Sequence, residues 1–207
     1  AGNANYAWIQ HMIHHLGPNG KIGLVLANGA LSSQTSGEGD IRKNIIEADL
    51  VEGIVALPTQ LFYSVTIPVT LWFISKNKKQ KGKTLFVDAR KMGYMVNRKH
   101  RDFTEGIQDD GSLGDIDLLA KTFEDFQNGT LDEEQGFSAI ATIEDIVKQD
   151  YVLTPGRYVG IEEQKDDGEP FEEKMARLTL ELSGMFKKSH ELEGEIRKKL
   201  GAIGYEV

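Results

Sequence analysis

Apolar residues follow two patterns along the first part of the chain, a helical spacing and an unbroken run. Residues 6–16 place apolar side chains, Ile9 and Ile13 among them, three or four positions apart, which predicts an amphipathic helix. After a Gly-Pro turn, residues 22–27 form an apolar run without polar alternation, as is typical of a strand buried on both faces. A helix and a strand in this order indicate an α/β fold with helices packed on a parallel sheet.

A second helix is predicted over residues 41–50. Asp40 is expected to cap its N-terminus, because an Asp side chain accepts hydrogen bonds from the first free backbone N–H groups of a helix. Ile41, Ile45 and Ala48 lie on one side of such a helix and are expected to face inward.

Two more strands are expected after this helix. Residues 51–57 are an apolar run that ends at Pro58, and residues 69–75 are rich in β-branched and aromatic side chains. The connection of about eleven residues has no helical period, so an antiparallel pair joined by a long loop is the simplest arrangement. The loop carries the adjacent aromatics Phe62 and Tyr63.

The following segments are shorter. Residues 85–88 predict one more strand, whereas residues 92–107 have no clean period and are expected to be irregular. Apolar spacing predicts a helix over residues 115–127, which a glycine ends. Thr142 stands three residues before Asp145, a near match to the capping box that begins a helix.

A long helix is predicted near the end of the chain, after an acidic linker at residues 160–168. Pro170 suits its first turn, and apolar residues recur from there at alternating steps of four and three as far as Ile196, with Ser189 as the polar exception. Such a seam suits packing against another helix, within the chain or in a partner. The expected division is residues 1–90, an α/β part; 91–160, an irregular and helical extension; and 161–207, the linker and a partner-binding helix.

Composition narrows the possible chemistry. The 207 residues include no cysteine, which excludes disulfides, thiolate nucleophiles and cysteine-bound zinc. No apolar run is long enough to span a membrane and no secretory signal begins the sequence, so we expect a cytoplasmic protein. His11 and His15 are four positions apart, as metal ligands often are, but no third ligand stands nearby, and packing or hydrogen bonding is the simpler interpretation.

Charge is unevenly distributed. Residues 76–101 hold ten Lys or Arg and one acid, although the net charge of the whole chain is −8. The overall acidity argues against a general nucleic-acid binder, but this basic stretch could steer a phosphate backbone. A solvated hairpin tip is the simpler alternative.

Common catalytic patterns are missing. The sequence contains no Gly-x-Ser-x-Gly elbow and no P-loop, and its paired carboxylates lie on amphipathic or loop segments without a Gly-rich frame. Asn28 and Gly29 follow the first strand, where ligands gather in open α/β sheets. A plain turn explains these two residues equally well.

A series of segments spread over most of the chain matches one family in residues and in order. The segments are residues 3–12, 17–21, 28–31, 41–43, 54–63, 67–68, 86–90, 136–138 and 155–159. They resemble the modification subunit of type I restriction-modification systems, a family of S-adenosylmethionine-dependent DNA adenine-N6 methyltransferases. The resemblance implies the C-terminal half of a class I methyltransferase (Rossmann-like) α/β sheet, followed by a helical region and a long C-terminal helix.

The chain also departs from this family. The family's Gly-rich cofactor loop and its Asn-Pro-Pro-aromatic motif, whose Asn side chain and Pro carbonyl hold the adenine amino group, precede these segments and are absent here. The chain therefore looks like the C-terminal part of a longer protein. We expect no catalytic residue within it and no methyl transfer by the chain alone.

The resemblance assigns roles to aromatic side chains. Trp8 matches the position where related enzymes place an aromatic beside the adenine ring of S-adenosylmethionine; a core residue that flanks the helix is the alternative. Phe62 matches the aromatic that stacks on the flipped-out target base, with Tyr63 as the fallback. A pair that anchors the loop in the core is the alternative for both.

The resemblance also implies partners. These are DNA, the specificity subunit, which would bind the C-terminal helix over residues 170–200, and the restriction subunit of the full complex. Two other interpretations stay open. The chain could be a stand-alone, non-catalytic interaction module that uses the long helix, or a different nucleotide-binding α/β enzyme without its first half.

Overall fold

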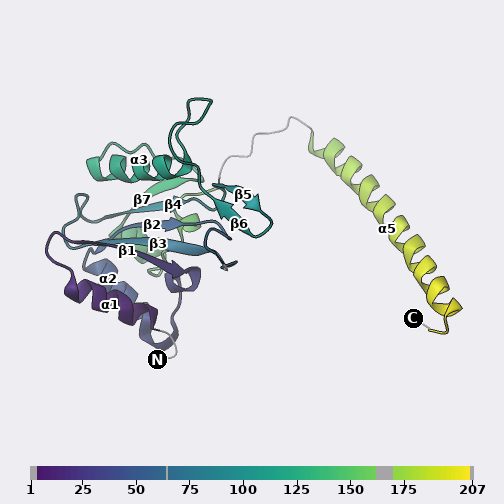
Figure 1. The fold of residues 1–207 in the computed structure, drawn as a ribbon, viewed down its shortest axis with the longest axis horizontal. Coiled ribbons are helices and arrows are strands. Elements are labelled where there is room, and N and C mark those ends of the chain that lie inside the picture. The colour runs from purple at the N-terminus through teal and green to yellow at the C-terminus, as the bar shows by residue number, and fades with distance from the viewer. Residues whose placement is uncertain (1–3, 64, 162–169, 206–207) are drawn as a thin grey trace. The chain divides into compact units, whose positions relative to one another are not determined.

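The computed structural model describes residues 4–63, 65–161 and 170–205. The chain divides into two compact units, Ala1–Glu163 and Gln164–Val207. The described part of the first unit is built on a five-stranded sheet with helices on both sides, and that of the second is one long helix (Figure 1).

The sheet has the strand order β1-β3-β2-β4-β7. Its strands are β1 Lys21–Ala27, β2 Val51–Ala56, β3 Val69–Ser75, β4 Lys83–Asp88 and β7 Ser138–Thr142. β3 is antiparallel to both β1 and β2, which confirms the predicted antiparallel pair. β2 and β4 are parallel, and β7 is antiparallel to β4. The sheet is therefore mixed rather than parallel, because the connection from β2 to β3 holds no crossover helix and β3 inserts between β1 and β2.

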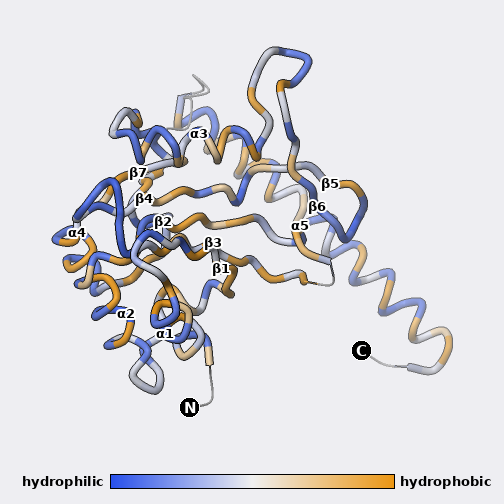
Figure 2. Tube along the Cα trace, turned by 60° about the vertical axis from the view of Figure 1, so that its left-hand side comes forward, coloured by the Kyte–Doolittle hydropathy of each residue, from blue (hydrophilic) through white to orange (hydrophobic). Residues whose placement is uncertain are grey.

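Helices cover both faces of the sheet (Figure 1). α1 Asn5–His15, α2 Glu38–Glu47 and α4 Ile143–Lys148 pack on one face, and α3 Asp115–Asn128 packs on the other. Trp72 and Phe86 are fully buried on the first side, and Phe126 is fully buried on the second. Figure 2 shows the resulting pattern, with hydrophobic residues in orange concentrated along the strands between the helices.

The start of α2 differs from the prediction. Gly37, in the left-handed conformation with a φ of 79°, is the N-cap, and Asp40 lies in the first turn. The prediction of Asp40 as the cap is wrong because the chain turns earlier, at a glycine that adopts positive φ without strain. Ile45 is buried as expected, whereas Ala48 is exposed and Ile46 takes the buried position instead.

Residues 92–107 are more regular than predicted. They contain a two-stranded hairpin, β5 Tyr94–Asn97 and β6 His100–Asp102. The prediction of an irregular segment is wrong here, since strands of four and three residues are too short to display a period.

Two helix boundaries confirm their sequence signals. α3 ends at Gly129, which adopts a φ of 72°. At the start of α4, the Thr142 hydroxyl accepts a hydrogen bond from the Asp145 N–H, and the Asp145 carboxylate accepts one from the Thr142 N–H. The capping box is therefore complete.

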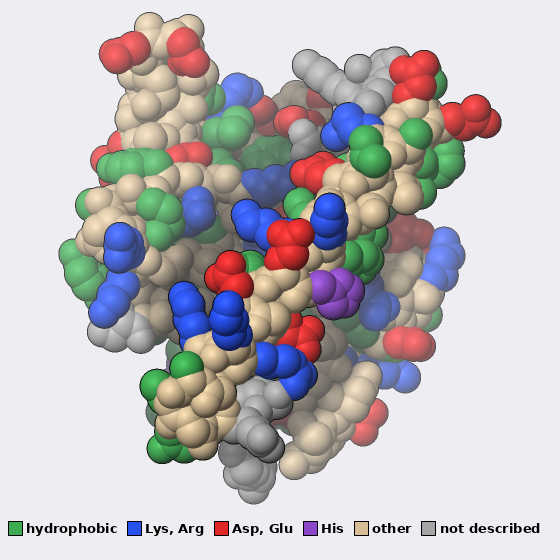
Figure 3. All heavy atoms as spheres, turned by 90° about the vertical axis from the view of Figure 1, so that its right-hand side faces the viewer, with side chains coloured by type: hydrophobic (Ala, Val, Ile, Leu, Met, Phe, Trp, Pro, Cys, Tyr) green, Lys and Arg blue, Asp and Glu red, His purple; other side chains and the backbone are tan. Residues whose placement is uncertain are grey.

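α5 Phe171–Ala202, with Pro170 as its N-cap, confirms the predicted long helix. None of its described side chains is buried, and Figure 3 shows hydrophobic, basic, acidic and histidine side chains exposed on α5. The exposed seam consists of Phe171, Met175, Leu178, Leu182, Met185, Leu192 and Ile196. The acidic linker predicted at 160–168 lies, from residue 162 on, outside the described residues. Over the described ranges, no helix has the length and apolar character needed to cross a membrane.

Candidate functional site

Three strands that run in the same direction end at one edge of the sheet. β1 and β2 are both antiparallel to β3, and β4 is parallel to β2. The loops that follow them, residues 28–37, 57–68 and 89–93, therefore meet at this carboxyl edge. Ligands of open α/β sheets bind at such edges. The Oδ1 atom of Asn28, directly after β1, is buried there without a hydrogen-bond partner among the described residues.

The loop after β2 presents two aromatic rings to solvent. Phe62 is 41% exposed and Tyr63 is 83% exposed. Within the described part of the chain, the two rings therefore lie outside the core. The Tyr63 ring stacks on the His100 ring of β6, with a centroid distance of 4.5 Å and an interplanar angle of 20°. Tyr63 has one face occupied by this stack.

Backbone hydrogen bonds join this loop to the hairpin. The Gln60 carbonyl accepts from the Arg101 N–H at 2.9 Å, and the Gln60 side-chain amide donates to the Arg98 carbonyl at 3.2 Å. Gln60 has a φ of 64°, an uncommon conformation for a residue with a side chain. The loop and the hairpin thus form one structural unit at the carboxyl edge, which we call the loop–hairpin unit.

Trp8 lies near the same edge, on α1. The hydroxyl of Tyr6, two residues earlier, donates to the Ala30 carbonyl at 2.6 Å in the loop after β1, so the N-terminal end of α1 lies at the carboxyl edge. Trp8 is 58% exposed, whereas Tyr6 and Ile9 take the buried positions. Within the described part of the chain, Trp8 is therefore not a core residue.

The histidine pair on α1 has a local explanation. The Nδ1 atom of His15 lies 2.8 Å from the His11 carbonyl oxygen, and the two rings are 4.3 Å apart. In the part of the chain that the structure describes, no group of three or more His, Cys, Asp or Glu side chains could hold a metal ion.

A buried arginine supports the loop after β1. Arg42 is 1% exposed; its Nε donates to the Tyr151 carbonyl and its Nη1 to the Ser33 carbonyl, both at 2.7 Å. Nη1 also lies 3.5 Å from the Tyr6 hydroxyl, whose pKa is raised by burial. Glu38, one turn earlier, is buried, and its carboxylate has no hydrogen-bond partner among the described residues. Periodicity did not reveal this network.

The end of β4 brings together two segments that are distant in the sequence. Arg90 donates to both carboxylate oxygens of Asp88, at 2.8 and 2.5 Å, and this interaction raises the pKa of Arg90. Gly156 lies beside the pair, where a Cβ would come within 3.3 Å of the guanidinium. The Phe86 and Tyr158 rings stack with centroids 3.8 Å apart.

The basic stretch does not form one surface. Residues 76–83 connect β3 to β4 at the edge opposite the carboxyl edge, whereas residues 90–101 contain the hairpin. In the first group, Lys78 is 4% exposed and is paired with Asp49 at 2.5 Å. Only the second group lies next to the aromatic loop.

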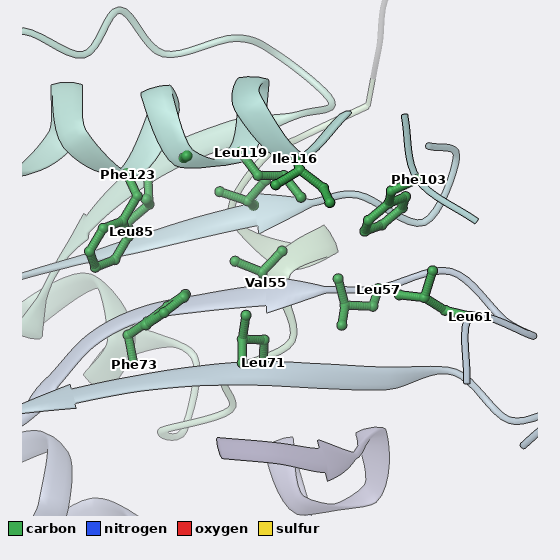
Figure 4. A pocket seen from close by; sticks show the side chains of 12 residues that line it. Val55, Leu57, Leu61, Leu71, Phe73, Leu85, Phe103, Ile116, Leu119 and Phe123 are labelled. Carbon is green, nitrogen blue, oxygen red and sulfur yellow. The ribbon is translucent and has the colours of Figure 1, made fainter. Parts of the chain in front are cut away.

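An apolar cavity of about 470 Å³ lies between α3 and the sheet (Figure 4). Its lining includes Val55 and Leu85 from the strands, Leu119 from α3, and Leu61 and Phe103 from the ends of the loop and the hairpin. All of the lining side chains are apolar. S-adenosylmethionine carries charges and hydroxyl groups that need polar partners, so this cavity does not suit it. Instead, the apolar packing of Leu61 and Phe103 around this cavity anchors the loop–hairpin unit.

Comparison with known proteins places the chain in a family. A family model of N-6 DNA methylases matches residues 1–167. The methylase subunit of the type I restriction enzyme HindI from Haemophilus influenzae is 56% identical over 206 residues, which is 99% of this chain and 45% of that protein. The methylase subunit of the type I restriction enzyme MjaIX from Methanocaldococcus jannaschii is 46% identical over 209 residues, or 99% of this chain and 36% of that protein.

Solved structures agree with these relatives. The methyltransferase subunit of a type I restriction-modification system from Streptococcus thermophilus has a TM-score of 0.63 and 26% identity, covering 77% of this chain and 30% of that one. The chain spans less than half the length of the curated relatives it matches. It belongs to the N-6 DNA methylase family.

Proposed function

We propose that the parent protein transfers the methyl group of S-adenosylmethionine to N6 of adenine in DNA. This chain contributes the carboxyl edge of the methyltransferase sheet. The observation that carries the proposal is the exposed aromatic loop at that edge, where ligands of such sheets bind. When bound, S-adenosylmethionine supplies an electrophilic methyl group on its sulfonium.

Phe62 is the stronger candidate for the target base. A base extruded from the duplex loses its stacking, and an aromatic ring offsets about 1–3 kcal/mol of that loss. Tyr63 already stacks on His100, whereas no ring stacks on Phe62 among the described residues. Trp8, exposed on α1 at the same edge, would lie against the adenine ring of the cofactor.

Phe62→Ala tests this assignment in the full-length subunit assembled with its specificity subunit. Methyl transfer to DNA is expected to fall about tenfold or more, since about 1–3 kcal/mol of stacking is lost. The Kd for S-adenosylmethionine is expected to stay unchanged. Trp8→Ala is the reciprocal variant and should raise that Kd while leaving DNA binding intact. Unchanged methylation by Phe62→Ala, with unchanged cofactor affinity, would remove Phe62 from the site.

The groups that hold the adenine amino group lie, in this proposal, in the part of the relatives that this chain does not span. The family's catalytic motif is absent from the sequence. The 207-residue chain by itself would therefore not methylate DNA, although it would contribute to the binding of both base and cofactor.

The long helix supports an assembly role. Its apolar seam is exposed along its whole described length, as suits a helix that packs against a partner helix. We assign this seam, over residues 170–200, to the specificity subunit. The restriction subunit would join in the full complex, and the complex would act in the cytoplasm.

The same seam favours a second candidate function. The chain could serve as a non-catalytic interaction module in which the sheet is a scaffold and α5 is the binding element. The two functions can be distinguished by substitutions at the carboxyl edge of the parent protein. Such substitutions should change methyl transfer only if the chain is part of a methyltransferase site.

A further inference from the structure

The tip of the β5–β6 hairpin carries exposed cations in an ordered turn. Arg98 and Lys99 are both exposed, and neither pairs with a carboxylate among the described residues. The Asn97 carboxamide oxygen accepts from the Lys99 N–H at 2.9 Å, which orders the turn. Figure 2 shows the hairpin orange along β5 and blue around its tip. The only acid on the two strands is Asp102, at the base of β6.

The hairpin is held firmly although all of β5 is exposed. An isolated hairpin of this size is marginally stable in water. Here the Nη1 atom of Arg101 donates to the carbonyls of Met92 and Gly93, both at 3.0 Å. Phe103, just beyond β6, lines the apolar cavity below. The base of the hairpin is therefore fixed, and the cationic tip projects from it.

The tip lies beside the aromatic loop. His100 stacks on Tyr63, the neighbour of Phe62, and Arg98 accepts the side-chain hydrogen bond of Gln60 through its carbonyl. Arg98 and Lys99 directly precede His100, whose ring contacts the loop. Two residues span at most about 7 Å of backbone, so the Cα atoms of both cations lie within about 7 Å of the His100 Cα. Figure 1 shows the hairpin at the edge where β2 and β4 end.

We propose that the hairpin tip holds the DNA phosphate backbone next to the extruded base, with Arg98 and Lys99 as the phosphate ligands. Phosphate contacts by Arg and Lys position DNA without reading its sequence. The tip and Phe62 would thus act together, one on the backbone and one on the base. The inference rests on the proposed function and names the cations that serve it. The basic residues 76–83, at the opposite edge, are not expected to take part.

The test compares two double variants in the full-length subunit assembled with its specificity subunit. Arg98→Ala/Lys99→Ala removes the cations of the tip, and Lys81→Ala/Lys83→Ala removes two exposed cations at the opposite edge. Each phosphate contact contributes about 0.9 to the slope of log K for DNA binding against log salt concentration. The tip variant should reduce the slope by about 1–2, the control should leave it unchanged, and Arg98→Lys/Lys99→Arg should preserve it.

Equal slopes for wild type and the tip variant, or equal reductions in the tip and control variants, would overturn the proposal. Unchanged urea midpoints verify that each variant is folded. The salt slope and methyl transfer test the phosphate contacts and the proposed function separately. A changed slope without methyl transfer by the wild-type complex would contradict the proposed function alone, whereas methyl transfer with an unchanged slope would contradict this inference alone.

Discussion

Arg42 illustrates how one buried side chain can support a site that periodicity does not reveal. In the sequence it is a cation on an amphipathic helix, and such cations are usually solvated. In the structure it is 1% exposed and connects α2 to the loop after β1 and to Tyr151. Its partners are backbone carbonyls 9 and 109 residues away, which leave no pattern in the sequence. The family-matched segment 41–43 is the one signal that marks this position.

Arg42→Met should lower the free energy of unfolding by about 3 kcal/mol. The substitution leaves the carbonyls of Ser33 and Tyr151 without their donors and removes a buried cation from the vicinity of Glu38. Urea denaturation measures the effect. Lys43→Met, at the next and exposed position, loses a surface ion pair with Glu47 and a cation–π contact with the Tyr151 ring, and should cost about 1 kcal/mol or less. Similar costs for the two variants would contradict this role of Arg42.

The aromatic residues show what sequence can and cannot locate. The family resemblance selected Trp8, Phe62 and Tyr63, and all three side chains are exposed. It ranked Phe62 before Tyr63, but it could not reveal the stack of Tyr63 on His100, which joins residues far apart in the sequence. The roles of these residues remain predictions until the variants are assayed.

At the scale of elements, long periodic segments were predictable and short ones were not. α3, α5 and β2 follow their sequence patterns, since each is long enough to display a period or an unbroken run. The apolar run at 22–27 does form a strand, β1, but the prediction that it is buried on both faces is wrong for the described chain, because Val25 is 43% exposed. The hairpin was missed, and the α2 cap was misplaced, because a few residues and one positive-φ glycine decide them. The antiparallel direction of β3 was predicted from a connection without a helical period, whereas its position between β1 and β2 and the antiparallel β7 were not predicted.

The capping box of α4 predicts a pH dependence of stability. Hydrogen bonds from Lys148 and Thr142 lower the pKa of Asp145 from 3.8 to about 2. Because the pKa of the folded state lies below that of the unfolded state, the carboxylate contributes stability above pH 4 that is lost as the pH falls toward 2. Asp145→Asn should therefore be less stable than wild type at neutral pH, and the difference should shrink as the solution is acidified.

Urea unfolding at a series of pH values measures this difference. Glu144→Gln, the exposed acid beside Asp145, is the matched control and should show no such trend. A destabilisation of Asp145→Asn that is the same at pH 3 and pH 7 would contradict the lowering of the Asp145 pKa by Lys148 and by Thr142 of the capping box.

The seam of α5 predicts a separation of folding from assembly. Leu178→Glu/Leu182→Glu places two charges on the seam, and Ala176→Glu/Leu180→Glu places two at the same spacing off it. Only the seam pair should abolish co-purification with the specificity subunit, since a charge buried at a helix interface is costly. Deleting residues 169–207 should have the same effect while sparing the unfolding transition of the first unit. A deletion variant that still co-purifies would contradict the assignment.

At the scale of the whole molecule, several of the matched family segments meet at the carboxyl edge. Segments 54–63 and 86–90 run to this edge along β2 and β4, and 155–159 packs against the end of β4. Within the described part of the chain β1 pairs only with β3, and Val25 on β1 is 43% exposed. The open side of β1 is an edge at which a further strand could pair, and the chain spans 45% of the length of the HindI methylase subunit.

Methyl transfer by the pure 207-residue chain should be measured beside the full-length subunit assembled with its specificity subunit, because this comparison decides whether the chain carries only part of the site. Labelled S-adenosylmethionine and DNA that contains the target sequence are supplied to both. We expect the full-length assembly to transfer labelled methyl groups to adenine N6 and the chain alone to transfer none. Detectable transfer by the chain alone would contradict the claim that its carboxyl edge is only part of the site.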